Sequence, residues 1–166
     1  MNRVHFLVYG LIYHIDKNFT DSSRRRDSGE GEKMIQYAEL SIGRELGRGG
    51  FGVVYLGTWR MTDIAVEEHL LGQLTNDVRK EFEAEVQTMK ELRHPNIIQF
   101  LSYCISPRPC IVMEYMPRGS LHQLMSDRQA EILWDVRMPI GMDITRGQAD
   151  LHAENIVHLG YECAVD

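Results

Sequence analysis

Three glycines and one acid carry most of the chemistry that this sequence offers. Gly47, Gly49 and Gly52 lie in one short segment between two strand-like runs, and Glu67 ends the next run. Glycine lets a backbone approach phosphate groups closely, because it has no Cβ atom to block the approach. A lysine at position 67 would neutralise such phosphates, whereas the Glu67 carboxylate repels them. The residues therefore indicate a nucleotide site in which an acid stands where a cation is expected.

The elements that position these residues follow from the apolar pattern. Strands are expected over 42–47, 53–59 and 63–66, with the glycine segment joining the first two. A helix is expected from Asn76 to about Leu92, because apolar residues recur there every three or four positions. These residues form its expected buried face: Val78, Phe82, Val86, Met89 and Leu92.

The second half of the chain continues with two strands and two helices. Runs 97–103 and 110–115 predict an antiparallel pair around a proline-containing turn. Ser120 is a candidate cap for a short helix that ends near Met125. A longer helix is expected over about 132–152.

Composition restricts the class of protein and its partners. A length of 166 residues, with 43% hydrophobic and 25% charged residues, suits one ordinary domain with a real core. The net charge of −6 argues against nucleic acid or an anionic membrane as the main partner. Cys104, Cys110 and Cys163 show no metal-ligand spacing. We therefore expect no metal site, and we expect free thiols in a reducing, cytoplasmic compartment.

The N-terminal residues leave two interpretations open. The apolar stretch from Val4 to Ile15 has twelve residues, whereas a membrane span needs about 20. A stray strand or a weakly structured leader is one interpretation. A remnant of a membrane anchor is the other, because Arg24–Arg26 follow the stretch like a cytoplasmic basic flank. Residues 20–33 are polar and read as a solvated linker.

Several motifs in fixed order resemble one family. The glycine segment is followed by residues 57–66, Phe82–Val86, Leu92–Ile98 and Ile111–Leu121, in the order of a eukaryotic protein kinase domain. Over residues 39–158 the chain resembles the first half of that domain, and it is most similar to the tyrosine-kinase-like group.

The resemblance implies an α+β fold. We expect a protein-kinase-like small lobe with about five antiparallel strands and one long helix, then a hinge and the first helices of an incomplete large lobe. The chain is thereby divided into a leader and polar linker (1–38), a kinase-like small lobe (39–113) and the hinge with the start of a large lobe (114–166).

The resemblance also implies roles for single residues. Glu85 matches the helix acid that pairs with the strand lysine in active kinases. Met89, Phe100 and His158 match three side chains of the family's regulatory stack. A role in the core alone explains the apolar residues of the site equally well. The implied nucleotide-binding set comprises the phosphate loop, the adenine sandwich, the gatekeeper and the hinge: Gly47, Gly49, Gly52, Val54, Ala65, Met113, Glu114 and Met116.

Position 67 is the first departure from the family pattern. A charge pair about 4 Å apart at an effective dielectric constant near 20 is worth about 4 kcal/mol before solvent screening. Replacing lysine by Glu67 turns this attraction into repulsion, toward both the phosphates and Glu85. Either Glu85 swings away, or one of the two carboxyl groups takes up a proton and its pKa rises. Arg48 is the candidate substitute cation.

The second departure follows His158. The family continues with Arg-Asp and, five residues after the Asp, an Asn, whereas this chain continues with Leu159 and Gly160. We therefore expect no intact catalytic residue, only Glu67, Glu85 and the remnant His158. The metal-binding Asp-Phe-Gly and the rest of the large lobe are expected to be missing. Without that lobe, these apolar residues of the long helix are expected to lose packing partners and to form an exposed patch: Ile132, Leu133, Val136, Met138, Ile140 and Ile144.

Three functions remain open from the sequence. The first is a catalytically impaired kinase-like module that acts by binding a protein, such as another kinase. The second is an active ATP-dependent protein kinase that phosphorylates protein hydroxyl groups. The third is a fragment without a role of its own. The family implies ATP and Mg²⁺ as cofactors, but Glu67 and the absent metal ligands predict weak or no binding of both.

Overall fold

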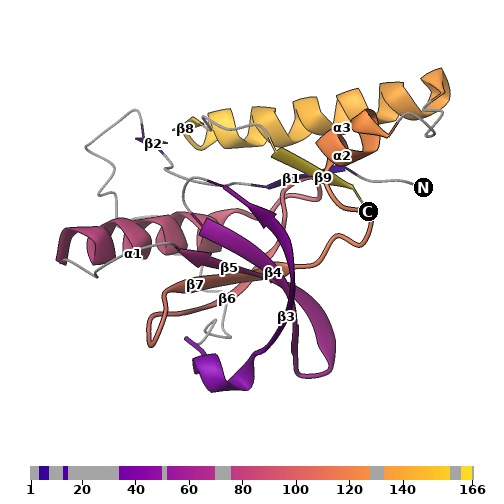
Figure 1. Cartoon of the computed structure of the whole chain (residues 1–166). Helices are drawn as coiled ribbons and strands as arrows, with labels where there is room; N and C mark the ends of the chain where they lie inside the picture. Colours follow the sequence, from indigo (N-terminus) through magenta and orange to yellow (C-terminus); the bar gives the residue numbers. More distant parts are fainter. Residues whose placement is uncertain are drawn as a thin grey trace.

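A computed structural model describes residues 4–7, 13–14, 34–49, 52–69, 76–127, 133–157 and 162–165. Its centre is a five-stranded antiparallel sheet in the order β3-β4-β5-β7-β6 (Figure 1). The strands are β3 (Ser41–Arg48), β4 (Gly52–Trp59), β5 (Thr62–His69), β6 (Phe100–Cys104) and β7 (Cys110–Glu114). The α+β small lobe expected from the sequence is therefore confirmed.

Strand β5 is longer than its apolar pattern predicts. A tight turn at Arg60 and Met61, both with positive φ, starts a continuous pairing with β4 from Trp59↔Thr62 to Gly52↔His69. Strand β7 pairs with the other edge of β5. The predicted end at Val66 is wrong, because the polar residues that follow are held between two neighbouring strands.

Helix α1 (Asn76–Glu91) packs on one face of the sheet, and its predicted apolar stripe is confirmed where side chains are described. Phe82, Val86 and Met89 are buried with residues of β6 and β7. Successive residues of a strand point to opposite faces, so Ala65, Glu67 and His69 share one face of β5. The contact between His69 and Phe82 identifies this face as the one that α1 covers.

The segment before β3 covers the opposite face. Ile35 and Leu40 flank a single 3-10 turn, Tyr37–Glu39, and are buried against Ile64, Val66 and Val112. This segment also contributes a polar contact. Tyr37 Oη donates a hydrogen bond to buried Glu68, which also accepts one from Arg108 Nη1 at 3.0 Å.

Two helices follow the sheet: α2 (Leu121–Ser126) and α3 (Trp134–Ala153). Ser120 is the predicted cap, since its side chain accepts a hydrogen bond from Gln123 N. The expected exposure of the long helix holds for Leu133 and Met138 but is wrong for Ile140. Ile140 is buried because Leu121, Val136 and Ile144 pack around it; Ile132 lies outside the described residues.

The N-terminal residues pair with the C-terminal ones. Strand β1 (Val4–Leu7) is antiparallel to β9 (Glu162–Val165), and β2 (Tyr13–His14) is antiparallel to β8 (Ile156–Val157). Figure 1 shows β1, β9, α2 and α3 together at one side of the molecule, apart from β6. Of the interpretations of the N-terminal stretch, a strand therefore applies to Val4–Leu7. Among the described residues, no helix is both long enough and apolar enough to cross a bilayer.

Candidate functional site

The structure brings four of the predicted nucleotide-binding positions together on the α1 face of the sheet. Val54 on β4 lies directly opposite Glu67 on β5, and Gly52 lies opposite His69. Ala65 precedes Glu67 by two residues and pairs with Met113 of β7. Val54 and Ala65 are both buried, as both the adenine-binding and the core interpretation require.

Glu67 lies beneath the start of β4, where the glycine segment ends. Its side chain is only 2% exposed. A Cβ atom added to Gly52 would lie 3.3 Å from Glu67 Cγ and 3.3 Å from Glu67 Oε1. The same Cβ would lie 2.7 Å from the backbone oxygen of Glu68, so only glycine fits at this position. Close strand pairing therefore accounts for Gly52 in this chain.

The other two glycines have no close neighbour in the part of the chain that the structure describes. Among these residues, a Cβ atom on Gly47 or on Gly49 would meet no atom within 4 Å. Gly49 N donates a hydrogen bond to Gly52 O at 3.0 Å, and this bond closes the turn between β3 and β4.

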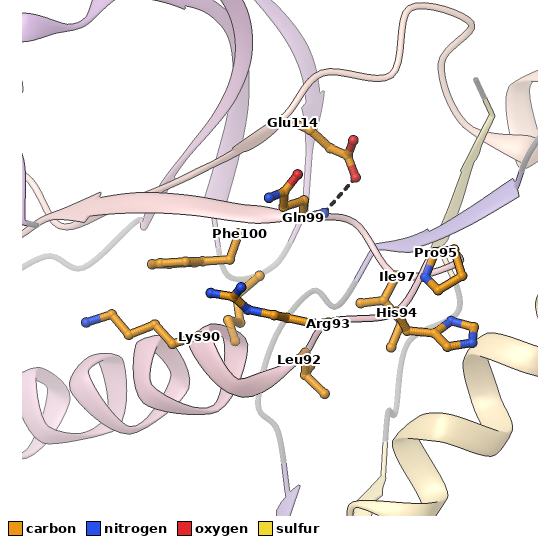
Figure 2. Close-up of a pocket in the computed structure, with 10 residues that line it drawn as sticks. Lys90, Leu92, Arg93, His94, Pro95, Ile97, Gln99, Phe100 and Glu114 are labelled. Atoms are coloured by element: carbon orange, nitrogen blue, oxygen red, sulfur yellow. Dashed lines mark hydrogen bonds between the residues drawn. The ribbon is translucent and has the colours of Figure 1, made fainter. Parts of the chain in front are cut away.

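The hinge positions are built into the core. Met113 is fully buried and Met116 nearly so, and both belong to the cluster beneath α1. Glu114 N donates to Gln99 O at 3.1 Å, and Glu114 Oε1 accepts from Gln99 N at 2.7 Å (Figure 2). Both hydrogen bonds join the end of β7 to the residue that precedes β6.

Glu85, the predicted partner of the strand lysine, lies beside a different residue of β5. Its Oε2 is 3.8 Å from His69 Nε2, and the two side chains are 12% and 9% exposed. The His69 ring also meets the Phe82 ring edge to face, with centroids 5.1 Å apart. Sequence reasoning missed His69, although a strand continued two residues past position 67 would have placed it on the same face.

Burial, rather than a neighbouring charge, dominates the protonation of this pair. It raises the pKa of Glu85 from 4.5 to about 7 and lowers the pKa of His69 below 6.5. The pKa of Glu85 is thus raised, as one of the two expected outcomes requires, but the cause is desolvation and not repulsion by Glu67.

Arg48 does not compensate for the acid at position 67. Its Nη2 lies 2.7 Å from Glu45 Oε2, and both side chains are exposed on β3. This geometry does not support Arg48 as a substitute cation, and an exposed arginine is the more common arrangement at such a position. His158, the predicted remnant of the catalytic loop, lies outside the described residues. Within the described ranges, no three side chains of His, Cys, Asp or Glu are grouped to hold a metal ion.

A separate pocket of about 310 Å³ lies between the end of α1 and the start of β6 (Figure 2). Buried apolar residues form part of its wall, and Lys90, Arg93 and His94 add basic groups. The Lys90 ammonium lies 4.4 Å from the centre of the Tyr103 ring. Of the predicted nucleotide-binding residues, Glu114 alone contributes to this wall.

Comparisons with known proteins agree with this architecture. The family model described as protein tyrosine and serine/threonine kinase matches residues 40–160. The chain is 40% identical over 141 residues to a probable serine/threonine-protein kinase, drkA, of Dictyostelium discoideum, covering 84% of this chain and 21% of that protein. It is 42% identical over 128 residues to drkB of the same organism, another probable serine/threonine-protein kinase, covering 76% of this chain and 19% of that protein.

A plant relative is also a probable serine/threonine-protein kinase. The chain is 36% identical over 147 residues to the probable serine/threonine-protein kinase SIS8 of Arabidopsis thaliana, covering 86% of this chain and 14% of that protein. The chain thus spans about a fifth or less of the length of these relatives. Membership of the tyrosine-kinase-like group stays a prediction. The matched family, the motif order and the five-stranded sheet with α1 show that this chain belongs to the protein kinase family.

Proposed function

We propose that this chain is a catalytically impaired protein-kinase domain, a pseudokinase, that acts by binding another protein. One observation carries the proposal: the residue at the position of the family's strand lysine is a buried acid, Glu67, beneath Gly52. Kinases of this family use ATP with Mg²⁺, and the strand lysine contacts the phosphates. In this chain the helix acid Glu85 lies against His69 instead.

The residues present do not fit a magnesium-bound triphosphate. An acid in place of the lysine exchanges an attraction of about 4 kcal/mol for a repulsion of similar size, before screening. Solvent screens this repulsion weakly, because Glu67 is buried. Since each 1.4 kcal/mol is about tenfold in affinity, we expect the affinity for ATP to fall by several powers of ten.

Protein binding is supported by an apolar stripe on α3. Trp134, Met138 and Met142 are 72%, 60% and 50% exposed, and they recur every four residues on one side of the helix. Large exposed apolar residues gathered on one face are typical of protein interaction sites. We propose a protein partner for this stripe, and another kinase domain is one candidate.

An active serine/threonine kinase is the alternative. The names of the relatives favour it, since each is called a probable serine/threonine-protein kinase. A transfer assay separates the two functions. Purified chain is incubated with labelled ATP, Mg²⁺ and a generic protein substrate. The proposal predicts incorporation no higher than with a heat-denatured sample, whereas clear incorporation would establish the alternative. Co-purification of a protein with the wild-type chain, but not with a Trp134→Glu, Met138→Glu variant, tests the binding role.

A further inference from the structure

His69 and Glu85 connect the sheet to helix α1 at a buried position. His69 is the last residue of β5 and Glu85 lies in the middle of α1, and their side chains approach to 3.8 Å between Nε2 and Oε2. His69 N also donates a hydrogen bond to Pro109 O at 3.2 Å, so the backbone that carries the ring is held in place. The contact therefore joins the end of β5 to the middle of α1.

The surroundings of the pair are poor in polar groups. Among the described residues, His69 Nε2 and Glu85 Oε1 are buried and have no hydrogen-bond partner. The neighbouring α1 residue is Phe82, the facing residue of β4 is Gly52, and β7 contributes Ile111 opposite Glu67. Asp63 and Glu67 are the other titratable groups on this face of β5 among the described residues, and Asp63 is exposed at the far end of the strand. The pair therefore lies beside the Phe82 ring, and Gly52 faces His69 across the strands.

Full charges are costly in such a place. A buried ion pair repays its desolvation only when further hydrogen bonds satisfy its remaining polar atoms, and here they do not. A separation of 3.8 Å is also longer than a charge-assisted hydrogen bond. A protonated carboxyl beside a neutral imidazole avoids the cost of burying two full charges.

We propose that His69 and Glu85 form a neutral pair that holds one proton, and that this pair positions helix α1 on the sheet in place of the family's lysine–glutamate ion pair. The pair is independent of whether the domain transfers phosphate. Loss of the proton leaves a carboxylate charge whose buried Oε1 has no hydrogen-bond partner among the described residues, so the contact between α1 and β5 weakens. The position of α1 thereby depends on pH.

The pH dependence of each partner has a definite sign. Because the pKa of Glu85 is raised from 4.5 to about 7, the folded chain keeps this proton where the unfolded chain has lost it, and stability falls as pH rises from 4.5 to about 7. The pKa of His69 is lowered from 6.5, so below pH 6.5 the unfolded chain binds a proton at His69 that the folded chain does not bind. Stability therefore falls as pH falls below 6.5. Between pH 4.5 and 6.5 the two slopes oppose each other.

Glutamine variants of the full chain separate these slopes. The folding equilibrium constant is measured by urea unfolding between pH 4.5 and 6.5 for wild type, His69→Gln, Glu85→Gln and the double variant. In His69→Gln only Glu85 titrates, so the folding equilibrium constant falls with rising pH relative to wild type. In Glu85→Gln only His69 titrates, so the folding equilibrium constant rises with pH. Each change amounts to at most about tenfold per pH unit for one proton. The double variant, the matched control, runs parallel to wild type. Four parallel curves would overturn the proposal.

A second measurement uses the wild type alone, so it remains informative if a variant fails to fold. The ¹³Cδ resonance of Glu85 should titrate near pH 7, and titration near the ordinary value of 4.5 would overturn the proposal.

Amide hydrogen exchange reports positioning. Protection factors of α1 should fall between pH 6 and pH 8 in wild type and stay constant in the double variant. Equal behaviour of the two proteins would contradict the positioning role.

Discussion

A Cβ atom at Gly52 would lie 3.3 Å from the Oε1 atom of Glu67, so the acid on β5 and the last glycine of the loop occupy adjoining space. Phosphate groups that enter beneath the loop would therefore approach a carboxylate. The glycine motif that suggests nucleotide binding thus lies directly beside the acid that would repel a nucleotide's phosphates.

Gly52→Ala tests how tightly this space is filled. The added methyl would lie 2.7 Å from Glu68 O, a backbone atom that the pairing of β4 and β5 holds in place. We expect the free energy of unfolding to fall by about 1–3 kcal/mol, as for other overpacked positions. Urea unfolding measures this loss.

Gly47→Ala is the matched control, because its added Cβ meets no described atom within 4 Å. Alanine in a strand interior is favoured over glycine by about 0.5–1 kcal/mol, so this variant should be unchanged or slightly more stable. Equal losses in the two variants would contradict the close contact at Gly52.

Tyr37→Phe tests the polar contact on the opposite face of the sheet. Glu68 is buried and accepts hydrogen bonds from Tyr37 and Arg108. Removing the tyrosine hydroxyl leaves a buried carboxylate with one donor fewer, which costs about 1–3 kcal/mol of unfolding free energy. Arg108→Gln should cost less than Tyr37→Phe, because the arginine is exposed. The reverse order in urea unfolding would refute this account.

The same tyrosine predicts an alkaline signature. Burial, together with the hydrogen bond to Glu68, raises the pKa of Tyr37 from 10 to about 12. The folded chain keeps a proton that the unfolded chain loses, so stability should fall as pH rises from 10 to 12. The difference in melting temperature between wild type and Tyr37→Phe should shrink over this range. A constant difference would exclude the contribution of Tyr37.

The sequence predicted the helix and the core better than the polar face of the site. The α1 stripe at Phe82, Val86 and Met89 follows from helical spacing, because these residues face the sheet whatever ligand is bound. The sequence predicted that β5 ends at Val66, because the three residues that follow are polar and a run of polar residues is typical of a turn. Only the strands on both sides show that Glu67 is buried, and only the pairing with Gly52 places the half-buried His69 on the same face.

The pairing of strands that lie far apart in the sequence could not be predicted either. The register Phe6↔Cys163 joins residues from opposite ends of the chain, and no local pattern specifies such a partner. Burial of Ile140 depended in the same way on Leu121 of another helix.

Phe6→Cys tests the pairing of the two ends. The register places position 6 directly opposite Cys163, so mild oxidation should form an intramolecular disulfide between β1 and β9. Mass spectrometry of a tryptic digest identifies the cross-link. Leu7→Cys is the control, because residue 7 pairs with Glu162 and successive strand residues point to opposite faces. Equal cross-linking of both variants, or of neither, would contradict the register.

Calorimetric titration with magnesium-ATP, comparing wild type with Glu67→Lys, tests the central claim most directly. Glu67→Lys replaces the acid at the phosphate position by the family's cation, and Glu81→Lys makes the same charge change at an exposed position of α1. We predict no saturable binding to wild type or Glu81→Lys at millimolar nucleotide, and affinity at least about tenfold higher for Glu67→Lys. Micromolar binding to wild type that Glu67→Lys leaves unchanged would contradict the account.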